Sequence, residues 1–319
     1  MQKVKDQFLQ LVDDYKEQAI SMRRYLHQYP ETAGCEKTTT NYIKERLQES
    51  DIEVVDSPFH TGLVAKVNGK TGGKIICIRV GIDALPVKEE SDVDFISKNE
   101  GACHCCGHDL HMAAAIICAK ILHETRNTWN GSVGFIFQPA TETGKGAEYM
   151  IRQQVLKILR PDVILGFHCW PELLVGSVGV RRGPMMAASD SLKIIIEGKS
   201  GSAAHPHKCV DPILISTYVM QLLQNIVSRE CSPVEPVVIT IGKIIGGTGG
   251  DSIPNIVEME GTVRTLRAAQ RICIRKAISR TVEHTAAAMG GTGHVTFIEN
   301  GDSVICDEIV ASYLEEAAA

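Results

Sequence analysis

The sequence has no long hydrophobic run, few aromatic residues and no excess of positive charge. Charged side chains recur from Met1 to Pro30, so this segment lacks the apolar stretch of a signal peptide or a membrane span. With 33 basic and 38 acidic residues the net charge is -5, which argues against a broad cationic surface for nucleic acid. Aromatic residues make up 5%, so the core must be mainly aliphatic. We expect a cytoplasmic protein with neither nucleic acid nor membrane as a partner.

The length and the cysteine content set expectations for domain number and redox state. The chain has 319 residues, of which 44% are hydrophobic, and single cores usually stop growing at roughly 250 to 300 residues. Two domains are therefore expected. The eleven cysteines are an odd number scattered along a chain without an export signal, which predicts reduced thiols.

Helical and strand-like segments alternate in the first half of the chain. Apolar residues from Lys3 to Tyr29 recur at a helical period, and Pro30 ends that helix. The next segments are predicted as a helix at Thr38–Glu49 and strands at Ile52–Val55, Lys74–Val80, Val133–Gln138 and Val163–Phe167. The alternation predicts an α/β fold with a mixed, largely parallel sheet.

The order of elements changes after about Ser191. The predicted elements are strand Leu192–Glu197, helix Pro212–Ser228, strand Val237–Ile244, strand Ile256–Thr265, helix Ala268–Met289 and strand His294–Ile298. This β-α-β-β-α-β order is the ferredoxin-like arrangement. We expect it to form an inserted domain over residues 189–299, with the first domain covering residues 1–188 and resuming at 300–319.

The densest cluster of potential metal ligands lies near the middle of the first domain. It comprises Cys103, His104, Cys105, Cys106, His108, Asp109 and His111. Thiols and imidazoles suit zinc, manganese or a similar ion. Cys103 and Cys106 form a Cys-x-x-Cys without the second pair of a zinc finger. The alternative is a helix start that carries ordinary buried thiols.

Two predicted strands are followed by residues that could join this cluster in one crevice. Glu142 follows the strand that ends at Gln138, and His168 follows the strand that ends at Phe167. Ligands of open α/β sheets gather at carboxyl ends of strands, so Glu142 and His168 are expected to join Cys106 and His108. Asp83, at a similar strand end, either orients a ligand histidine or is a turn residue.

The chain also resembles the peptidase M20 family, in its aminoacylase and hippurate-hydrolase branch. The resemblance covers nearly the whole sequence, through the segments RRYLHQYPE from Arg23, IDALP from Ile82, CGHDLH from Cys106, FQPATE from Phe137, GFHCWP from Gly166, VGVRRGPMMAA from Val178, HKCVDP from His207, GGT from Gly246 followed by IPN, and EGTVRT from Glu260. It implies a hydrolase that cleaves N-acyl amino acids with a metal-activated water.

The resemblance also implies a site and an assembly. The ligands would be Cys106, His108, Glu142 and His168, holding two divalent metals, manganese or zinc. Asp83 would assist at the catalytic site, and Arg264, Asp251 and His207 would lie near the substrate. The ferredoxin-like part would serve as a dimerisation or lid domain, giving a homodimer.

Two substitutions affect positions that carry chemistry in this family. Thr141 stands where the family has its base glutamate, and a hydroxyl cannot take and return the water's proton near neutral pH. Ser202 stands where the family has a histidine that stabilises the oxyanion, unless His205 replaces it. Loss of one oxyanion donor costs roughly a hundredfold to a thousandfold in rate. Gly81 and Asp251 replace an aspartate and an asparagine.

Three classes of function follow from these observations. The first is a metal-dependent amidohydrolase. The second is a catalytically impaired or truncated homologue that keeps metal binding, with one metal rather than two, and dimerisation, because the family's closing segment with a final histidine ligand is expected to be missing. The third is a redox protein that uses Cys103 and Cys106, which the absence of a thioredoxin-like context disfavours.

Overall fold

The computed structural model describes residues 2–318, which divide into two compact units at the boundary between Val175 and Gly176. The elements of the first unit are α1 (Gln2–Asp14), α2 (Lys16–Gln28), α3 (Lys37–Gln48), β1 (Glu53–Val55), β2 (Leu63–Asn68), β3 (Lys70–Gly81), α4 (His108–Glu124), β4 (Asn130–Gln138), α5 (Gly146–Arg152), α6 (Val155–Leu159) and β5 (Val163–Gly166). Within the described part of the chain, no helix combines the length and apolar character that crossing a membrane requires.

The first unit contains a five-stranded sheet in the order β1-β2-β4-β3-β5. Strand β3 runs parallel to β4 and β5, whereas β2 pairs antiparallel with both β1 and β4. Strand β2 therefore runs against the other four. The prediction of a mixed, largely parallel sheet is confirmed, although β2 was not among the predicted strands.

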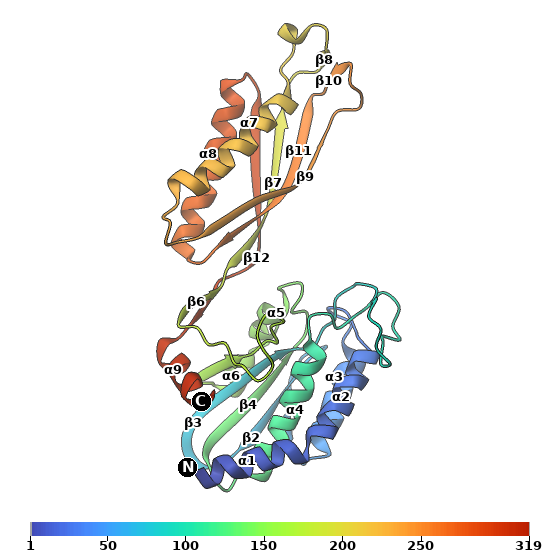
Figure 1. Ribbon diagram of the computed structural model, residues 1–319, viewed down its shortest axis with the longest axis vertical. Helices are drawn as coiled ribbons and strands as arrows, with labels where there is room; N and C mark the ends of the chain where they lie inside the picture. Colours follow the sequence, from blue (N-terminus) through green and yellow to red (C-terminus); the bar gives the residue numbers. More distant parts are fainter. Residues whose placement is uncertain (1, 319) are drawn as a thin grey trace. The chain divides into compact units, whose positions relative to one another are not determined.

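Helices cover both faces of this sheet (Figure 1). Strand β4 alternates its side chains, so that Phe135 and Phe137 join the core under α2, α3 and α4, while Ile136 joins a smaller core with Met150 and Leu159 of α5 and α6. All five side chains are nearly fully buried. The result is a three-layer α/β/α unit.

The first predicted helix is wrong in one respect, because α1 and α2 are separate helices. The break lies at Tyr15, whose hydroxyl donates to Glu124 Oε1 at 2.5 Å and whose ring lies 4.0 Å from Lys120 Nζ. Both partners belong to α4. A tertiary contact thus bends a segment that its sequence pattern predicts as continuous. The helix ends at Gln28, two positions before Pro30.

The parallel register places three strand ends at one edge. Gly81 of β3 lies opposite Gln138 of β4, and Arg79 of β3 lies opposite Gly166 of β5. Residues that follow these strands therefore start from the same edge of the sheet, the usual place for ligands in an open α/β sheet.

The second unit consists of the following strands, helices and turns, in chain order. They are β6 (Gly183–Met186), β7 (Ala188–Glu197), β8 (Gly201–Ser202), a 3-10 turn (Pro206–Lys208), α7 (Pro212–Asn225), a π-helical turn (Ile226–Glu230), β9 (Val237–Gly246), β10 (Ser252–Ile253), β11 (Ile256–Thr265), α8 (Ala268–Ala288), β12 (Thr292–Gly301), β13 (Val304–Cys306) and α9 (Glu308–Ala318).

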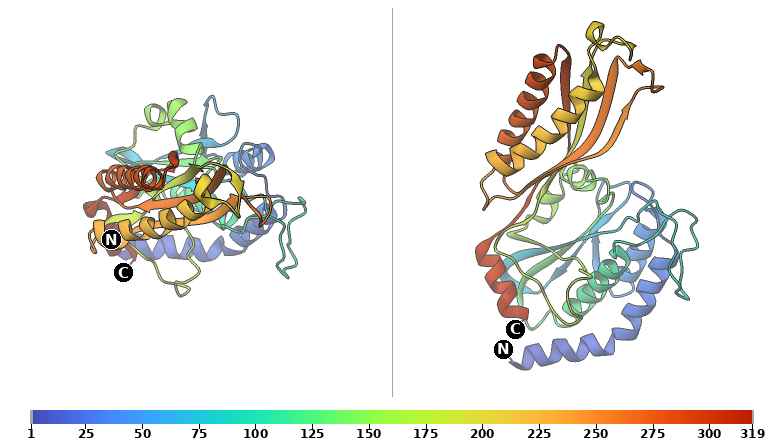
Figure 2. Two further views of the ribbon diagram at one scale, coloured as in Figure 1. Left: turned by 90° about the horizontal axis from the view of Figure 1, so that it is seen from above. Right: turned by 45° about the horizontal axis from the view of Figure 1, so that its top comes forward.

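Strands β12, β7, β11 and β9 form an antiparallel sheet in that order, and α7 and α8 cover one face (Figure 2). This is the ferredoxin-like topology that the order of elements predicts. Its core is aliphatic, with Ile194, Ile196, Val219, Leu223 and Ile278 fully buried. Strand β11 has the predicted bounds.

The prediction that all thiols are reduced is wrong at one pair. Cys103 and Cys105 form a disulfide, with their Cα atoms 5.4 Å apart, within the usual span of such a bridge. The residues are close because they lie two positions apart in one loop, a proximity that a count of cysteines does not reveal. The other nine cysteines are free, including Cys106, so the Cys103–Cys106 pair of the redox hypothesis does not form.

Candidate metal centre

The site begins at the N-terminus of α4, where His108 is the first helical residue. Gly107 before it has φ +84°, a left-handed conformation that glycine adopts without strain. His108 Nδ1 lies 2.7 Å from the Asp83 carbonyl oxygen. A carbonyl only accepts hydrogen bonds, so Nδ1 carries the proton and Nε2 is the nitrogen available to a metal.

Asp83 connects this histidine to the loop after β4. Its side chain is buried, and its Oδ2 accepts a hydrogen bond from the Glu142 backbone N–H at 2.8 Å. Burial raises the pKa of Asp83, but hydrogen bonds from His108 and from the backbone of Glu142 and Thr141 outweigh it, so the pKa lies below its ordinary value. Asp83 is therefore a carboxylate at neutral pH.

The second buried support of α4 is Asp109. Its Oδ2 accepts hydrogen bonds from Arg23 Nε and His27 Nδ1, both at 2.8 Å. Both donors belong to α2, so they tie the first turn of α4 to the neighbouring helix. His108 at the start of α4 is thus held by Asp83 directly and by the Asp109 contacts through its helix.

The four predicted ligands come together at the carboxyl edge of the sheet. Cys106 Sγ lies 3.2 Å from His168 Nε2, and the donor atoms of Cys106, His108 and His168 lie within 4.8 Å of one another. Glu142 Oε1 lies 3.7 Å from His108 Nε2. The structure thus gathers residues from α4, the loop before it, and the segments after β4 and β5.

The donor set fits a divalent transition metal. One thiol, two imidazoles and one carboxylate are the ligand types that zinc takes. The buried Glu142 Oε1 has no hydrogen-bond partner among the described residues, as expected of an oxygen kept for a cation. Burial lowers the pKa of His108, but hydrogen bonds to Asp83 and Cys106 raise it to about 10 overall. A metal on Nε2 must therefore displace a proton.

Thr141, the residue in place of the base glutamate, lies beside this centre. Its Oγ1 accepts hydrogen bonds from Arg79 Nη2 at 3.1 Å and from Gln138 Nε2 at 3.3 Å. A Cβ added to Gly81 would lie 2.8 Å from both Thr141 Oγ1 and His108 Cε1. The hydroxyl and the imidazole therefore occupy space that any larger residue at position 81 would need.

Arg79, His111 and Cys169 also lie at this centre, although none of them was predicted as a site residue and only His111 was noted in the cluster of potential ligands. Arg79 Nε donates to Gln138 Oε1 at 2.8 Å, and burial lowers the pKa of its guanidinium. His111 is buried, and its Nε2 accepts the Cys169 N–H at 2.9 Å. Spacing could have revealed His111, since it follows His108 by three positions and so shares its face of α4.

The predicted residues of the second unit fall into two places. Ser202 of β8 is paired with Ser252 of β10, and the Ala203 N–H donates to the Asp251 carbonyl at 3.0 Å. His207, in the turn after β8, joins this exposed end of the unit. Arg264 does not, because it lies eight positions along β11 from Ile256, about 26 Å at strand spacing.

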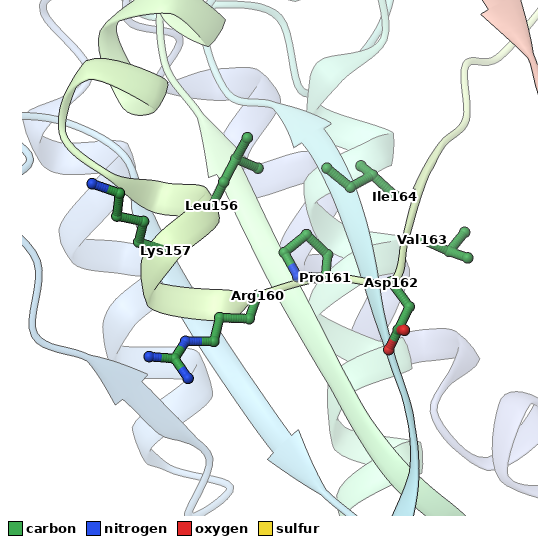
Figure 3. A pocket seen from close by; sticks show the side chains of 7 residues that line it. All are labelled: Leu156, Lys157, Arg160, Pro161, Asp162, Val163 and Ile164. Carbon is green, nitrogen blue, oxygen red and sulfur yellow. The ribbon is translucent and has the colours of Figure 1, made fainter.

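A separate surface hollow lies at α6 and the start of β5 (Figure 3). Its lining residues are Leu156, Lys157, Arg160, Pro161, Asp162, Val163 and Ile164. None of the predicted site residues belongs to it. Its carboxylate is already paired, since Asp162 accepts from Lys74 Nζ and from the Ile75 N–H, both at 2.9 Å. The candidate ligands therefore lie at the sheet edge and not in this hollow.

Comparison with known proteins places the chain in a family. The model of peptidase family M20/M25/M40 matches residues 77–318. The chain belongs to this family. It is 38% identical to the N-acetyl-L-cysteine deacetylase of Bacillus subtilis over 95% of this chain and 72% of that protein.

Two further known proteins are similar over most of the chain. The N-acyl-L-amino acid amidohydrolase of Geobacillus stearothermophilus is 37% identical over 92% of this chain and 79% of that protein. A dinuclear metal-binding M20 peptidase of Bacillus subtilis has a TM-score of 0.84 and 36% identity, covering 96% of this chain and 80% of that structure. M20 homologues of this chain thus act on N-acyl amino acids, and one binds two metals.

Proposed function

We propose that the protein is a metal-dependent amidohydrolase that cleaves the amide bond of N-acyl amino acids. One observation carries this proposal: the donors of Cys106, His108 and His168 lie within 4.8 Å of one another, with Glu142 Oε1 3.7 Å from His108 Nε2. These four side chains would hold a divalent metal, manganese or zinc. When bound, the metal would supply an activated water and polarise the amide carbonyl.

The protein's own residues would orient the metal ligands, and they determine whether a side chain can act as the general base. Asp83 would keep the His108 ring oriented through the carbonyl bond at 2.7 Å, which leaves Nε2 directed at the ligand cluster. Thr141 cannot act as the general base, so the proton of the water has no side-chain acceptor at that position. We therefore expect slow turnover from the protein as it stands.

The substrate class follows from the relatives. A deacetylase of N-acetyl-L-cysteine and an amidohydrolase of N-acyl-L-amino acids are both similar to this chain over more than nine-tenths of its length. N-acetyl and N-benzoyl amino acids are accordingly the first substrates to test. Ser202, Asp251, His207 and Arg264 are proposed to contribute to the oxyanion and substrate contacts.

We also propose that the two domains of the chain have different roles. Residues 1–188 with 300–319 would form the catalytic domain, and residues 189–299 would form a dimerisation and lid domain in a cytoplasmic homodimer. The independent core of the ferredoxin-like sheet, built from β7, β11, α7 and α8, supports the second assignment.

Metal content tests the proposed centre directly. The purified protein is expected to carry about one tightly bound transition metal, since three or four ligands suffice for a tetrahedral site. A Cys106→Ser, His168→Ala double variant should lose it, whereas Cys273→Ser, an exposed thiol on α8, should not. Elemental analysis after dialysis gives the answer. Metal at background level in the parent, or unchanged in the double variant, would refute the ligand assignment.

A further inference from the structure

A second group of soft donors lies beside the proposed centre. His111, His168 and Cys169 have donor atoms within 4.8 Å of one another, and the rings of His111 and His168 are 4.7 Å apart between centroids. His111 comes from α4, whereas the other two follow β5. His111 is buried and Cys169 is half-buried, so this group extends inward from the exposed His168.

Each donor of this group is held by a specific contact. His168 Nδ1 donates to the Cys169 carbonyl at 2.6 Å, so the lone pair of the ring lies on Nε2, which Cys106 Sγ contacts at 3.2 Å. The Cys169 sulfur lies against Gly107, where an added Cβ would overlap it. The Cys169 N–H fixes the His111 ring through Nε2 at 2.9 Å. Such supporting contacts orient ligands in metal sites.

We propose that His111, His168 and Cys169 form an alternative site for a soft divalent cation such as zinc or cadmium. Because His168 offers one ring lone pair, on Nε2, this site and the centre at Cys106 cannot both use that residue at once. A cation at the alternative site would also take the His111 lone pair from the Cys169 N–H, so it binds more weakly than at the centre. The inference goes beyond the proposed hydrolytic function, which does not require it.

Cobalt(II) distinguishes the two sites, because thiolate ligands give it a sulfur-to-metal charge-transfer absorption. The Cys106→Ser variant removes the sulfur of the centre, so that a sulfur-to-cobalt band then reports the alternative site. We expect this variant to bind cobalt with a charge-transfer band, and the Cys106→Ser, Cys169→Ser double variant to show none. The titration is anaerobic and without reductant, so that the Cys103–Cys105 disulfide contributes no thiolate.

Two matched variants complete the test. In the Cys106→Ser background, His111→Gln keeps an acceptor for the Cys169 N–H but removes the imidazole, and should weaken cobalt binding by more than about tenfold. Cys273→Ser in the same background should leave the titration unchanged. The proposal is overturned if Cys106→Ser shows no sulfur band, or if the band survives Cys169→Ser. The Cys169→Ser single variant tests the Cys106 centre separately, because it retains that thiol.

Discussion

In the proposed hydrolytic function, Thr141 stands at the position of the general base. Its hydroxyl occupies the place of a carboxylate and is held by Arg79 Nη2 at 3.1 Å. A carboxylate at the same position would pair with that guanidinium and stay ionised, so it could accept a proton from a bound water. The neighbouring cation would also lower its basicity, because an opposite charge stabilises the ionised form.

Thr141→Glu is therefore expected to raise the hydrolysis of N-acetyl or N-benzoyl amino acids. General acid-base help is worth roughly a hundredfold to ten-thousandfold, and Arg79 should keep the gain near the lower end of that range. Steady-state rates of the parent, Thr141→Glu, Thr141→Gln and Ser202→His, with manganese or zinc supplied, measure it. Thr141→Gln should gain nothing.

Other outcomes of that series are also informative. A Thr141→Glu, Ser202→His double variant completes the series, and if it alone responds, the two groups act as a unit. A parent that already turns over on the order of ten times per second would contradict the assignment of Thr141 as the defective position, and some other group would be the base.

A second prediction at the residue scale concerns Gly81. An added Cβ would lie 2.9 Å from His108 Nε2, so Gly81→Ala must displace the proposed ligand atom or Thr141. We expect cobalt affinity to fall by about tenfold to a hundredfold, as when a supporting residue of a metal site is lost. Gly166→Ala is the control, since it lies at the end of the adjacent strand β5 with open space around its Cβ. Equal affinities for the two variants would show that the close approach at Gly81 is unimportant.

At the scale of elements, a buried ion cluster joins strand β7 to helix α8. Asp190 is 1% exposed, and it accepts hydrogen bonds from Arg271 Nη2 at 2.5 Å and Arg275 Nη2 at 2.6 Å. Burial raises the pKa of Asp190, but the bonds from the two guanidinium groups lower it by more, so the pKa lies below its ordinary value. The contribution of this carboxylate to stability is therefore complete above the unfolded-state pKa of about 4.

Asp190→Asn is expected to lower the free energy of unfolding by about 3 to 5 kcal/mol at pH 7, because Arg271 and Arg275 lose their buried carboxylate and keep only exposed partners. The difference from the parent should shrink as the pH falls below about 4 and the native carboxylate is protonated. Denaturant melts at pH 7 and pH 3 measure it. Asp302→Asn, which removes an exposed partner of Arg271, should cost less than about 1 kcal/mol. A pH-independent difference would contradict the assigned role of the charge.

At the scale of the whole molecule, the edge strands of the ferredoxin-like sheet are relevant to assembly. Strand β9 pairs with β11 on one side, and the order of the described sheet leaves its other edge open. Ile244 and Ile245 on this strand are 48% and 57% exposed. An open edge with apolar side chains suits strand addition, and addition of a second copy would give a closed two-fold dimer.

We expect a homodimer in solution, and Gly242→Lys in β9 should shift it toward the monomer by placing a charge on the edge. The added side chain meets open space at that position, so the fold should tolerate it. Gly301→Lys at the end of β12 is the matched control and should leave the dimer intact. Light scattering at micromolar concentration, with circular dichroism to verify folding, decides between the two states. A folded monomeric parent would rule out the dimer.

Local signals in the sequence were sufficient for most of the architecture. The alternation of strands and helices predicts the α/β unit, and the β-α-β-β-α-β order predicts the second sheet, because hydrophobic period and turn residues act over a few neighbouring positions. The position of Glu142 and His168 just after predicted strands placed both at the edge where α4 begins. Parallel strands share that edge, so topology alone brings these residues together.

Only the tertiary structure decided what surrounds those residues. The break at Tyr15 depends on Glu124 and Lys120, more than a hundred positions away, and no helical period encodes such a contact. Likewise, the meeting of His111 with Cys169 depends on how the segment after β5 crosses the start of α4. The sequence by itself determined which side chains were available and at which strand ends. The packing of distant segments determined which of them lie close enough to share one cation, because donor atoms must approach within a few ångström to do so.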